Sequence, residues 1–395
     1  MAVAGIICEY NPFHNGHARQ FALLRQKLGE QTPIVCLMSG NFVQRGEAAV
    51  FDKMTRARAA VLCGADLVLE LPVTKALSSA ESFASGGVEL LCRTGCVDTL
   101  CFGCESGDGN IIMSTAKALL RPEFDRRLRS RLETGVSYAA ARQQALEDPA
   151  LAACLTRPND ILAVEYCKAL LRRGGGMKPL AIARRGDYLA QEPETENPSA
   201  LSLRRSIAAG TPWLQCVPPA VWELYEAAEV YGLLWGERAV LARLRTMTDA
   251  EFEALPYGTE GLWRRFMTAC RTQTGVEEIL QATKSKRYAR TRLQRMLLCA
   301  YLGIDGKTLQ SPISYVRVLA FNDTGRQLLR QMKREGDLSV VDAGRRPEDA
   351  SYYALERRCS DLYTLFARDA ANCRCRNEEK LRNFYDKNEK NTCKT

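Results

Sequence analysis

The sequence predicts an α/β protein in which a parallel sheet with crossover helices is followed by an α-helical region. Short apolar segments alternate with helical segments as far as about residue 183. Beyond about Gly210 the alternation stops, and apolar residues recur three and four positions apart instead. We therefore expect a sheet domain over residues 1–210 and an α-helical domain over residues 211–395, which ends in a polar tail from about residue 377.

The expected strands are short and almost wholly apolar, which is typical of strands covered on both faces of a parallel sheet. They cover residues 3–8, 34–38, 67–71, 99–102 and 178–183. Helices are expected at 17–28, 52–62, 79–93 and 158–172, with a helical insertion over about 110–157. In the second half, helices are expected at 213–244, 249–255, 261–270, 276–302 and 315–332. Functional loops should gather at the carboxyl ends of the parallel strands.

The composition excludes several classes of protein. The chain has 395 residues, of which 46% are hydrophobic, so it can build more than one core. No apolar run approaches the roughly 18 residues that a membrane helix needs, and no basic region precedes the first apolar segment. We therefore expect a cytosolic protein without a membrane partner.

The 16 cysteines are expected to be free thiols, because most of them lie inside expected strands or helices. Cys101 with Cys104 and Cys373 with Cys375 form close pairs, but no second pair stands at the spacing of a zinc ribbon. We predict no metal site within the protein.

A basic run stands out within the net charge of +9. Between residues 281 and 303 the acidic residues are missing, and the basic ones are Lys284, Lys286, Arg287, Arg290, Arg292 and Arg295. Such a run suits the phosphate backbone of an RNA. An ordinary solvated helix face explains it about equally well.

The chain contains two histidines, and both lie where the first expected strand gives way to a helix, in His14-Asn15-Gly16-His17. A helix N-terminus offers backbone N–H groups and a positive dipole end to a phosphate group. Both imidazoles can donate hydrogen bonds to triphosphate oxygens as charge builds on a leaving pyrophosphate. His-x-Gly-His in this position is the signature of Rossmann-like (HUP-type) nucleotidyltransferases, so we predict attack on the α-phosphate of a nucleoside triphosphate. The structural alternative is simple helix capping.

A second phosphate clamp is expected within residues 199–207, where Ser202 and Arg204 bring a hydroxyl and a guanidinium to the start of a helix. N-capping by Ser199 or Ser202 is the alternative explanation.

Four longer motifs make the chain resemble a known family. They cover residues 9–17 (Glu-Tyr-Asn-Pro-Phe-His-Asn-Gly-His), 38–47, 64–72 and 102–105. Together they resemble the bacterial tRNA(Met) cytidine acetate ligase family, and the resemblance runs from residue 1 to at least residue 326. The chain differs at residues 186–189 (Gly-Asp-Tyr-Leu), where family members often carry a glycine-rich Tyr-His-Asp stretch.

The resemblance implies a two-step reaction. ATP and acetate would give acetyl-adenylate and pyrophosphate, and N4 of the wobble cytidine of elongator tRNA(Met) would then take the acetyl group, releasing AMP. Magnesium is expected as the counter-ion of ATP. The catalytic residues would be His14, His17, Ser202 and Arg204, and the basic run would contact tRNA. The resemblance places ATP at Ile7, Cys8, Glu9, Tyr10, Asn11, Pro12, Phe13, His14, Asn15, Gly16, His17, Ala18, Arg19, Gln20, Gly103, Asn159 and Arg184.

Two other functions stay open at this point. The chain could be a nucleotidyltransferase that joins AMP to a small phosphorylated metabolite, although such enzymes are commonly shorter. It could also be a non-catalytic RNA-binding protein that has kept a nucleotide-binding fold. The sequence does not reveal which group removes the N4 proton, or the oligomeric state.

Overall fold

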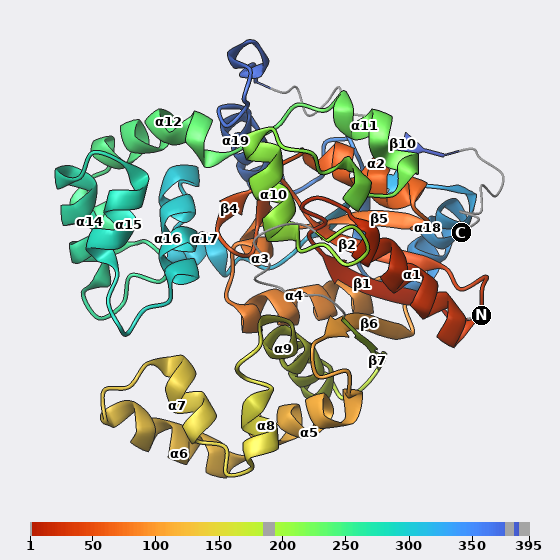
Figure 1. The fold of residues 1–395 in the computed structure, drawn as a ribbon, viewed down its shortest axis with the longest axis horizontal. Helices are drawn as coiled ribbons and strands as arrows, with labels where there is room; N and C mark the ends of the chain where they lie inside the picture. Colours follow the sequence, from red (N-terminus) through yellow and green to blue (C-terminus); the bar gives the residue numbers. More distant parts are fainter. Residues whose placement is uncertain (1, 185–193, 376–382, 387–395) are drawn as a thin grey trace.

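The computed structural model describes residues 2–184, 194–375 and 383–386 (Figure 1). Within these residues the main sheet has eight strands in the order β10-β8-β5-β2-β1-β6-β7, with β9 paired to β8. A separate hairpin joins β3 (Phe42–Val43) to β4 (Glu47–Ala48). The strands of the main sheet are β1 (Ala4–Cys8), β2 (Ile34–Ser39), β5 (Leu67–Leu71), β6 (Thr99–Cys104), β7 (Lys178–Ala183), β8 (Tyr315–Phe321), β9 (Ser339–Asp342) and β10 (Phe384–Tyr385).

The predicted parallel sheet is confirmed. β5, β2, β1, β6 and β7 are all parallel, and they correspond to the five strands expected from the sequence. The chain moves outward from β1 in one direction to β5 and then returns to add β6 and β7 on the other side. This reversal leaves a crevice beyond the carboxyl ends of β1 and β6, which is where open α/β sheets bind ligands.

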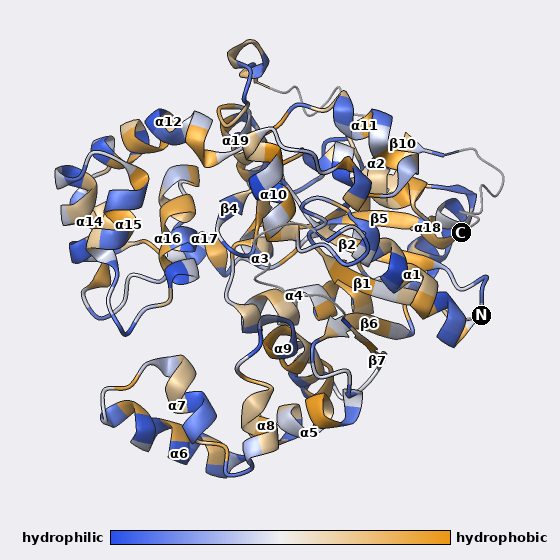
Figure 2. Ribbon diagram, in the orientation of Figure 1, coloured by the Kyte–Doolittle hydropathy of each residue, from blue (hydrophilic) through white to orange (hydrophobic). Residues whose placement is uncertain are grey.

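Helices cover both faces of the sheet, because successive side chains of a strand point to opposite sides. Ile6 packs into one core with Phe21 of α1 (Asn15–Leu28), whereas Ile7 packs into the other core with Phe83 of α4 (Ala80–Arg93). Figure 2 shows the apolar residues gathered along the central strands. The remaining helices around the sheet are α2 (Lys53–Leu62), α3 (Val73–Ala76), α9 (Pro158–Arg172), α10 (Ala200–Ala209), α11 (Trp222–Glu226), α18 (Asp323–Glu335) and α19 (Ala350–Thr364).

Two groups of helices project from the sheet (Figure 1). The expected insertion forms α5 (Gly109–Leu119), α6 (Pro122–Glu133), α7 (Tyr138–Gln144) and α8 (Pro149–Ala153). The second group has its own core, which includes Leu244, Phe266, Ile279 and Leu297. It consists of α12 (Leu233–Thr246), α13 (Asp249–Glu253), α14 (Leu262–Thr272), α15 (Val276–Thr283), α16 (Arg290–Leu302) and α17 (Gly306–Leu309). Short 3₁₀ turns lie at Leu214–Cys216, Pro219–Val221 and Ala370–Asn372.

The second half differs from the expectation in several respects. The single helix expected over 213–244 is wrong, because this stretch forms two 3₁₀ turns, α11 and most of α12, and residues 227–232 are not helical. The helix expected over 276–302 is interrupted between α15 and α16, at residues 284–289. The helix expected over 315–332 was wrong in its first part, because Tyr315–Phe321 forms β8, antiparallel to β5. Val316 and Val318 are buried and β-branched, so they suit a strand covered on both faces. The sheet therefore takes strands from beyond residue 210, and a domain boundary at that residue stays a prediction.

No helix in the described ranges combines the length and hydropathy that a bilayer crossing requires.

One buried arginine fixes the ends of the strands that border the crevice. Arg56 of α2 is 0% exposed and donates to four backbone carbonyls. Its Nε bonds Phe51 O at 2.9 Å, its Nη1 bonds Glu9 O at 2.5 Å and Ser39 O at 3.1 Å, and its Nη2 bonds Gly40 O. A single rigid guanidinium thus joins the segments that leave β1 and β2.

Replacing Arg56 by methionine should lower the free energy of unfolding by about 3–5 kcal/mol, because it leaves several buried carbonyls without a donor. Urea unfolding followed by circular dichroism measures the change. Arg58→Met, which removes an exposed arginine on the same helix, should cost at most about 1 kcal/mol. Equal losses in the two variants would contradict the role given to Arg56.

Candidate functional site

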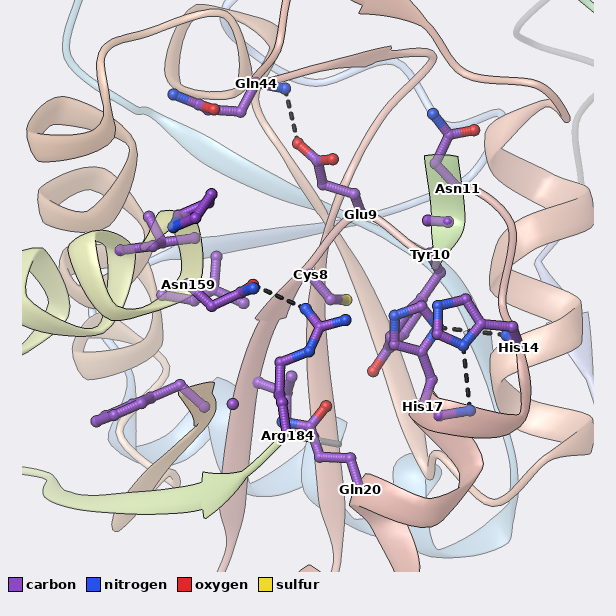
Figure 3. A pocket seen from close by; sticks show the side chains of 18 of the residues that line it. Cys8, Glu9, Tyr10, Asn11, His14, His17, Gln20, Gln44, Asn159 and Arg184 are labelled. Carbon is purple, nitrogen blue, oxygen red and sulfur yellow. Dashed lines mark hydrogen bonds between the residues drawn. The ribbon is translucent and has the colours of Figure 1, made fainter. Parts of the chain in front are cut away.

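A cavity of about 560 Å³ lies at the carboxyl ends of β1, β6 and β7 (Figure 3). Its walls come from the turn between β1 and α1, from Gly103 on β6, and from Arg184 directly after β7. Pockets for small ligands commonly measure about 300–1,000 Å³, so this one can hold a nucleotide. It lies at the edge of the sheet where functional loops are expected, and their function stays a prediction.

The two histidines begin α1 and form a reciprocal capping arrangement. His14 Nδ1 accepts a hydrogen bond from Gly16 N at 3.1 Å, and His17 Nδ1 accepts one from His14 N at 3.3 Å. The two rings are stacked, with their centroids 3.7 Å apart. Capping uses only the Nδ1 atoms, so it leaves the Nε2 atom of each ring available to a ligand.

Both imidazoles are neutral near pH 7. Burial, with the charges of Arg184 and Arg204, lowers the pKa of His14 to about 3. Burial and the neighbouring His14 likewise hold the pKa of His17 well below its ordinary value. Since both Nδ1 atoms accept bonds, the ring proton of each must be on Nε2. His14 Nε2 is buried in the described structure and has no partner there, so it is a donor that awaits an acceptor.

Two glycines are needed because side chains of the site lie directly against them. A Cβ atom on Gly16 would come within 3.0 Å of His14 Cε1, and so would press on the imidazole ring. A Cβ atom on Gly103 would meet Arg184 Cγ at 2.9 Å. Gly103 therefore lets the Arg184 side chain cross β6 and reach the cavity.

Arg184 is held by a network at the start of α9. Arg184 Nη1 donates to Asn159 Oδ1 at 2.8 Å, and Asn159 Nδ2 donates to Glu105 Oε1 at 2.6 Å. The Glu105 carboxylate also accepts from the backbone N–H of Asn159 and of Asp160, and so caps α9. The structure thus brings Asn159 and Arg184 together, opposite the histidine pair (Figure 3).

Of the two residues of the predicted phosphate clamp, Arg204 lies at the cavity and Ser202 does not. Arg204 lines the cavity, donates to Asn11 O at 3.0 Å and pairs with Glu47 at 3.3 Å. Ser202 is 0% exposed, and its hydroxyl donates to Ser199 O at 2.8 Å. Ser199 caps α10 by accepting from Ser202 N at 3.0 Å. Ser202 is not among the described residues that line the cavity, so the structure brings Arg204 to the site without it.

Most of the predicted ATP segment borders the cavity. The residues of this segment that line it are Ile7, Cys8, Glu9, Tyr10, Asn11, His14, Gly16, His17, Arg19 and Gln20. Pro12, Phe13, Asn15 and Ala18 are absent from the described lining. Phe13 instead supports the turn from behind, where its N–H donates to Tyr225 Oη at 3.1 Å. The stretch at 186–189, where the chain differs from the family pattern, lies outside the described residues.

The members of the basic run differ in exposure and in their partners. Lys284, Lys286 and Arg287 are exposed in the segment between α15 and α16, and Arg287 also pairs with Glu260 at 3.2 Å. Arg290 pairs with Glu277, and Arg292 donates to Tyr257 O at 2.7 Å. The run nevertheless passes beside the cavity, because Thr291 lines it.

Arg295 belongs to α16, and its side chain is buried between this helix and the segment that follows β2. It is 8% exposed and donates to Gln44 O at 3.2 Å. Gly46 packs against the backbone of α16, where a Cβ atom would come within 2.5 Å of Arg295 N. Arg295 therefore joins the helical group to the sheet.

Several residues that line the cavity were not predicted as site residues: Gln44, Arg45, Phe83, Tyr166 and Thr291. Gln44 and Arg45 lie in a polar, glycine-containing loop directly after a strand, and this is a signal that sequence reasoning could have used. Tyr166 and Thr291 lie within helical patterns, where nothing local distinguishes them.

Comparisons with known proteins give a consistent result. The family model described as HIGH Nucleotidyl Transferase matches residues 1–379. The tRNA(Met) cytidine acetate ligase of Acetivibrio thermocellus is 36% identical over 86% of this chain and 88% of its own length. The ligase of the same name from a Thermoanaerobacter species is 34% identical over 92% of this chain and 95% of its own length.

Solved structures are similar along nearly the whole chain. Thermotoga maritima TmcAL bound with alpha-thio ATP superposes with a TM-score of 0.88 at 27% identity, and it covers 98% of this chain and 100% of its own. The apo form of the same protein gives a TM-score of 0.89 at 28% identity over the same shares of both chains.

The histidine pair predicts how stability depends on pH. The folded-state pKa of His14 is about 3, below the ordinary value of 6.5, so the unfolded chain takes up this proton first as the pH falls. Stability should be lost between about pH 6.5 and pH 3, by about 1.4 kcal/mol per pH unit for this group. Urea unfolding at pH 8 and pH 5 measures the loss, and His14→Asn, which keeps a capping side chain, should lose less over this interval. NMR of the two imidazole rings provides a direct check. A His14 resonance that titrates near pH 6.5 would be incompatible with this interpretation.

Proposed function

Because this chain belongs to the tRNA(Met) cytidine acetate ligase family of HIGH nucleotidyl transferases, we propose that it acetylates N4 of the wobble cytidine of elongator tRNA(Met). ATP and acetate are the other substrates, and AMP and pyrophosphate are the products. The relatives cover 86–92% of this chain, so the similarity includes the helical group as well as the sheet. Because the substrate is a tRNA, we place the reaction in the cytoplasm.

The observation that carries the proposal is the buried, unpartnered Nε2–H of His14 in a cavity that fits a nucleotide. A neutral donor binds a phosphate oxygen without a full charge of its own. Its bond to that oxygen strengthens as negative charge accumulates on the leaving pyrophosphate. The free site has already removed water from the donor, so little reorganisation is needed during the reaction.

The other side chains of the cavity support the activation step. Arg204 lies on the histidine side of the cavity, where its positive charge favours the triphosphate. Arg184 and Asn159 form the opposite wall and supply a guanidinium and an amide for the nucleotide (Figure 3). An acetate oxygen then attacks the α-phosphorus, and pyrophosphate leaves toward the helix N-terminus.

The tRNA would approach over the segment between α15 and α16. Lys284, Lys286 and Arg287 are exposed there, and α16 begins beside the cavity with Thr291. Phosphate contacts at these positions would orient the anticodon without reading its sequence. Arg290, Arg292 and Arg295 would act indirectly, since they hold α16 against its neighbours.

Magnesium would enter with ATP. In the described part of the chain, no group of three His, Cys, Asp or Glu side chains could hold a metal ion. A magnesium ion in this site would therefore be held mainly by the phosphates and water, as is common for this ion.

His14→Ala should lower acetate-dependent exchange between pyrophosphate and ATP by about 10²–10³-fold, because it removes one donor to the developing charge. His14→Asn is the matched variant, since asparagine still caps α1 but does not restore a donor at the position of Nε2. Both variants should also fail to form N4-acetylcytidine, measured by nucleoside mass spectrometry with isotope-labelled acetate. Full exchange activity in His14→Asn would reduce the role of this residue to capping.

Reversing the three exposed charges, as Lys284→Glu, Lys286→Glu and Arg287→Glu together, should weaken tRNA binding at least about tenfold at 0.1 M salt. ATP affinity should change less than about twofold, and the salt dependence of tRNA binding should become shallower. Reversal of three exposed charges on α18, at Arg330, Lys333 and Arg334, controls for the change in net charge. Similar losses in the two triple variants would move the tRNA surface elsewhere.

A further inference from the structure

Acetyl transfer to a cytosine needs a base, and the histidines cannot supply it. The lone pair of an exocyclic cytosine amine is delocalised into the ring, so the amine attacks well only if its proton is removed as the new bond forms. His14 and His17 already accept backbone N–H groups at Nδ1 and present protonated Nε2 atoms. Both are therefore donors in this cavity.

Two other ionisable groups near the cavity can be excluded as the base. Both oxygens of Glu105 accept bonds at the start of α9, so this carboxylate is occupied. Burial holds the pKa of the Cys8 thiol well above its ordinary value, so the thiol stays protonated. Among the described residues that line the cavity, Glu9 remains as a carboxylate with a free oxygen.

Glu9 lies at the carboxyl end of β1, between the Gln44 loop and the histidine pair (Figure 3). Its Oε1 accepts a hydrogen bond from Gln44 N at 2.8 Å, which fixes the carboxylate in one orientation. Within the described structure no hydrogen bond is made to its Oε2. The carboxylate is thus anchored through one oxygen and can receive a hydrogen at the other.

A second unpartnered polar group borders the same cavity. Tyr166 of α9 is 3% exposed, and its hydroxyl is buried with no partner in the described structure. Burial, and secondarily the neighbouring ionisable side chains of Cys8 and Glu9, raise the pKa of Tyr166, so its hydroxyl stays protonated. A buried donor therefore lies close enough to Glu9 for the two groups to interact electrostatically.

The charges around Glu9 tune its basicity. Burial raises the pKa of Glu9, whereas the N–H of Gln44 and the guanidinium groups of Arg45 and Arg204 oppose this change. A raised pKa makes a carboxylate a stronger base. The charged and titratable groups that face it are Arg45 and Glu47 after β2, Arg56 on α2, Tyr166 on α9 and Arg204 on α10.

We propose that Glu9 accepts the N4 amine of the acceptor cytosine and removes its proton during acetyl transfer, while the Tyr166 hydroxyl donates to the acetyl carbonyl oxygen. In this step the N4 nitrogen bonds to the acetyl carbon, and the C–O bond to the AMP phosphate breaks. The electron pair of that bond leaves with AMP, and the N4 proton passes to the Glu9 carboxylate. A carboxylate is also a suitable acceptor for recognising the N4 amine of a cytosine. The inference rests on the proposed function.

The test measures the two half-reactions separately on the full chain. Acetate-dependent exchange between pyrophosphate and ATP reports the activation step. Single-turnover transfer of labelled acetate to unmodified elongator tRNA(Met), quantified by nucleoside mass spectrometry, reports the second step. Glu9→Gln suits this test, because the glutamine carbonyl can still accept from Gln44 N–H while the base is lost.

Glu9→Gln should slow single-turnover transfer by about 100-fold. Because Glu9 also borders the nucleotide cavity, any loss of exchange should be at least about tenfold smaller than the loss of transfer. The fall of the transfer rate toward low pH should disappear with it, and Glu9→Asp should recover part of the rate. Tyr166→Phe should also slow transfer more than exchange. Glu81→Gln, which removes a carboxylate on α4 outside the described lining, should leave both steps unchanged.

Two results for Glu9→Gln would overturn the inference: transfer at the original rate, or exchange that falls in parallel with transfer. Tyr166→Phe with unchanged transfer would remove the hydroxyl from the mechanism. If the proposed function itself is wrong, the unmodified protein will show no acetate-dependent exchange, and this result is distinct from any result for the Glu9 variant. That result would overturn the inference about Glu9 as well.

Discussion

The guanidinium of Arg56 is the interaction on which the crevice depends. Parallel strands end in carbonyl groups that no neighbouring strand satisfies, and a crevice between them would leave those groups either wet or unpaired. Arg56 satisfies the carbonyls that follow β1 and β2 from within the protein. The ends of both strands are therefore fixed while the space in front of them stays open. The buried positive charge also lies behind a cavity that is proposed to bind a polyanion.

Dehydration determines the chemistry of the histidine pair. An exposed imidazole would be partly protonated near neutral pH, and its charge would attract any phosphate. The two rings are stacked, little exposed to solvent and close to the charges of Arg184 and Arg204, so each ring stays neutral and keeps a single proton on Nε2. The arginines supply constant charge, whereas the histidines supply directed bonds. The directed bonds of the histidines would therefore stabilise the transition state, in which negative charge develops on the leaving group, more than they stabilise the bound substrate.

Local patterns in the sequence were sufficient to predict the strands and helices of the half that carries the cavity. The strand, turn and helix around His14 were predicted because the apolar run and the motif lie within a few residues of each other. β8 was missed because a short apolar run reads equally well as a helix, and its partner β5 lies far away in the sequence. The same limit applies to Arg295, which has the spacing of a helix surface but lies under a loop from the other half. Ser202 was assigned to a phosphate clamp because helix caps and phosphate clamps use the same residue types. In the structure it belongs to the cap of α10.

One residue, Gln44, contacts both the candidate site and the helical group. The N–H of Gln44 holds the Glu9 carboxylate, and the carbonyl of the same residue receives the guanidinium of Arg295 from α16. A rotation of α16 against the sheet would therefore act on the same residue that orients the Glu9 carboxylate. Gln44 therefore links the helix whose surface would meet the anticodon to the carboxylate that would meet the target base.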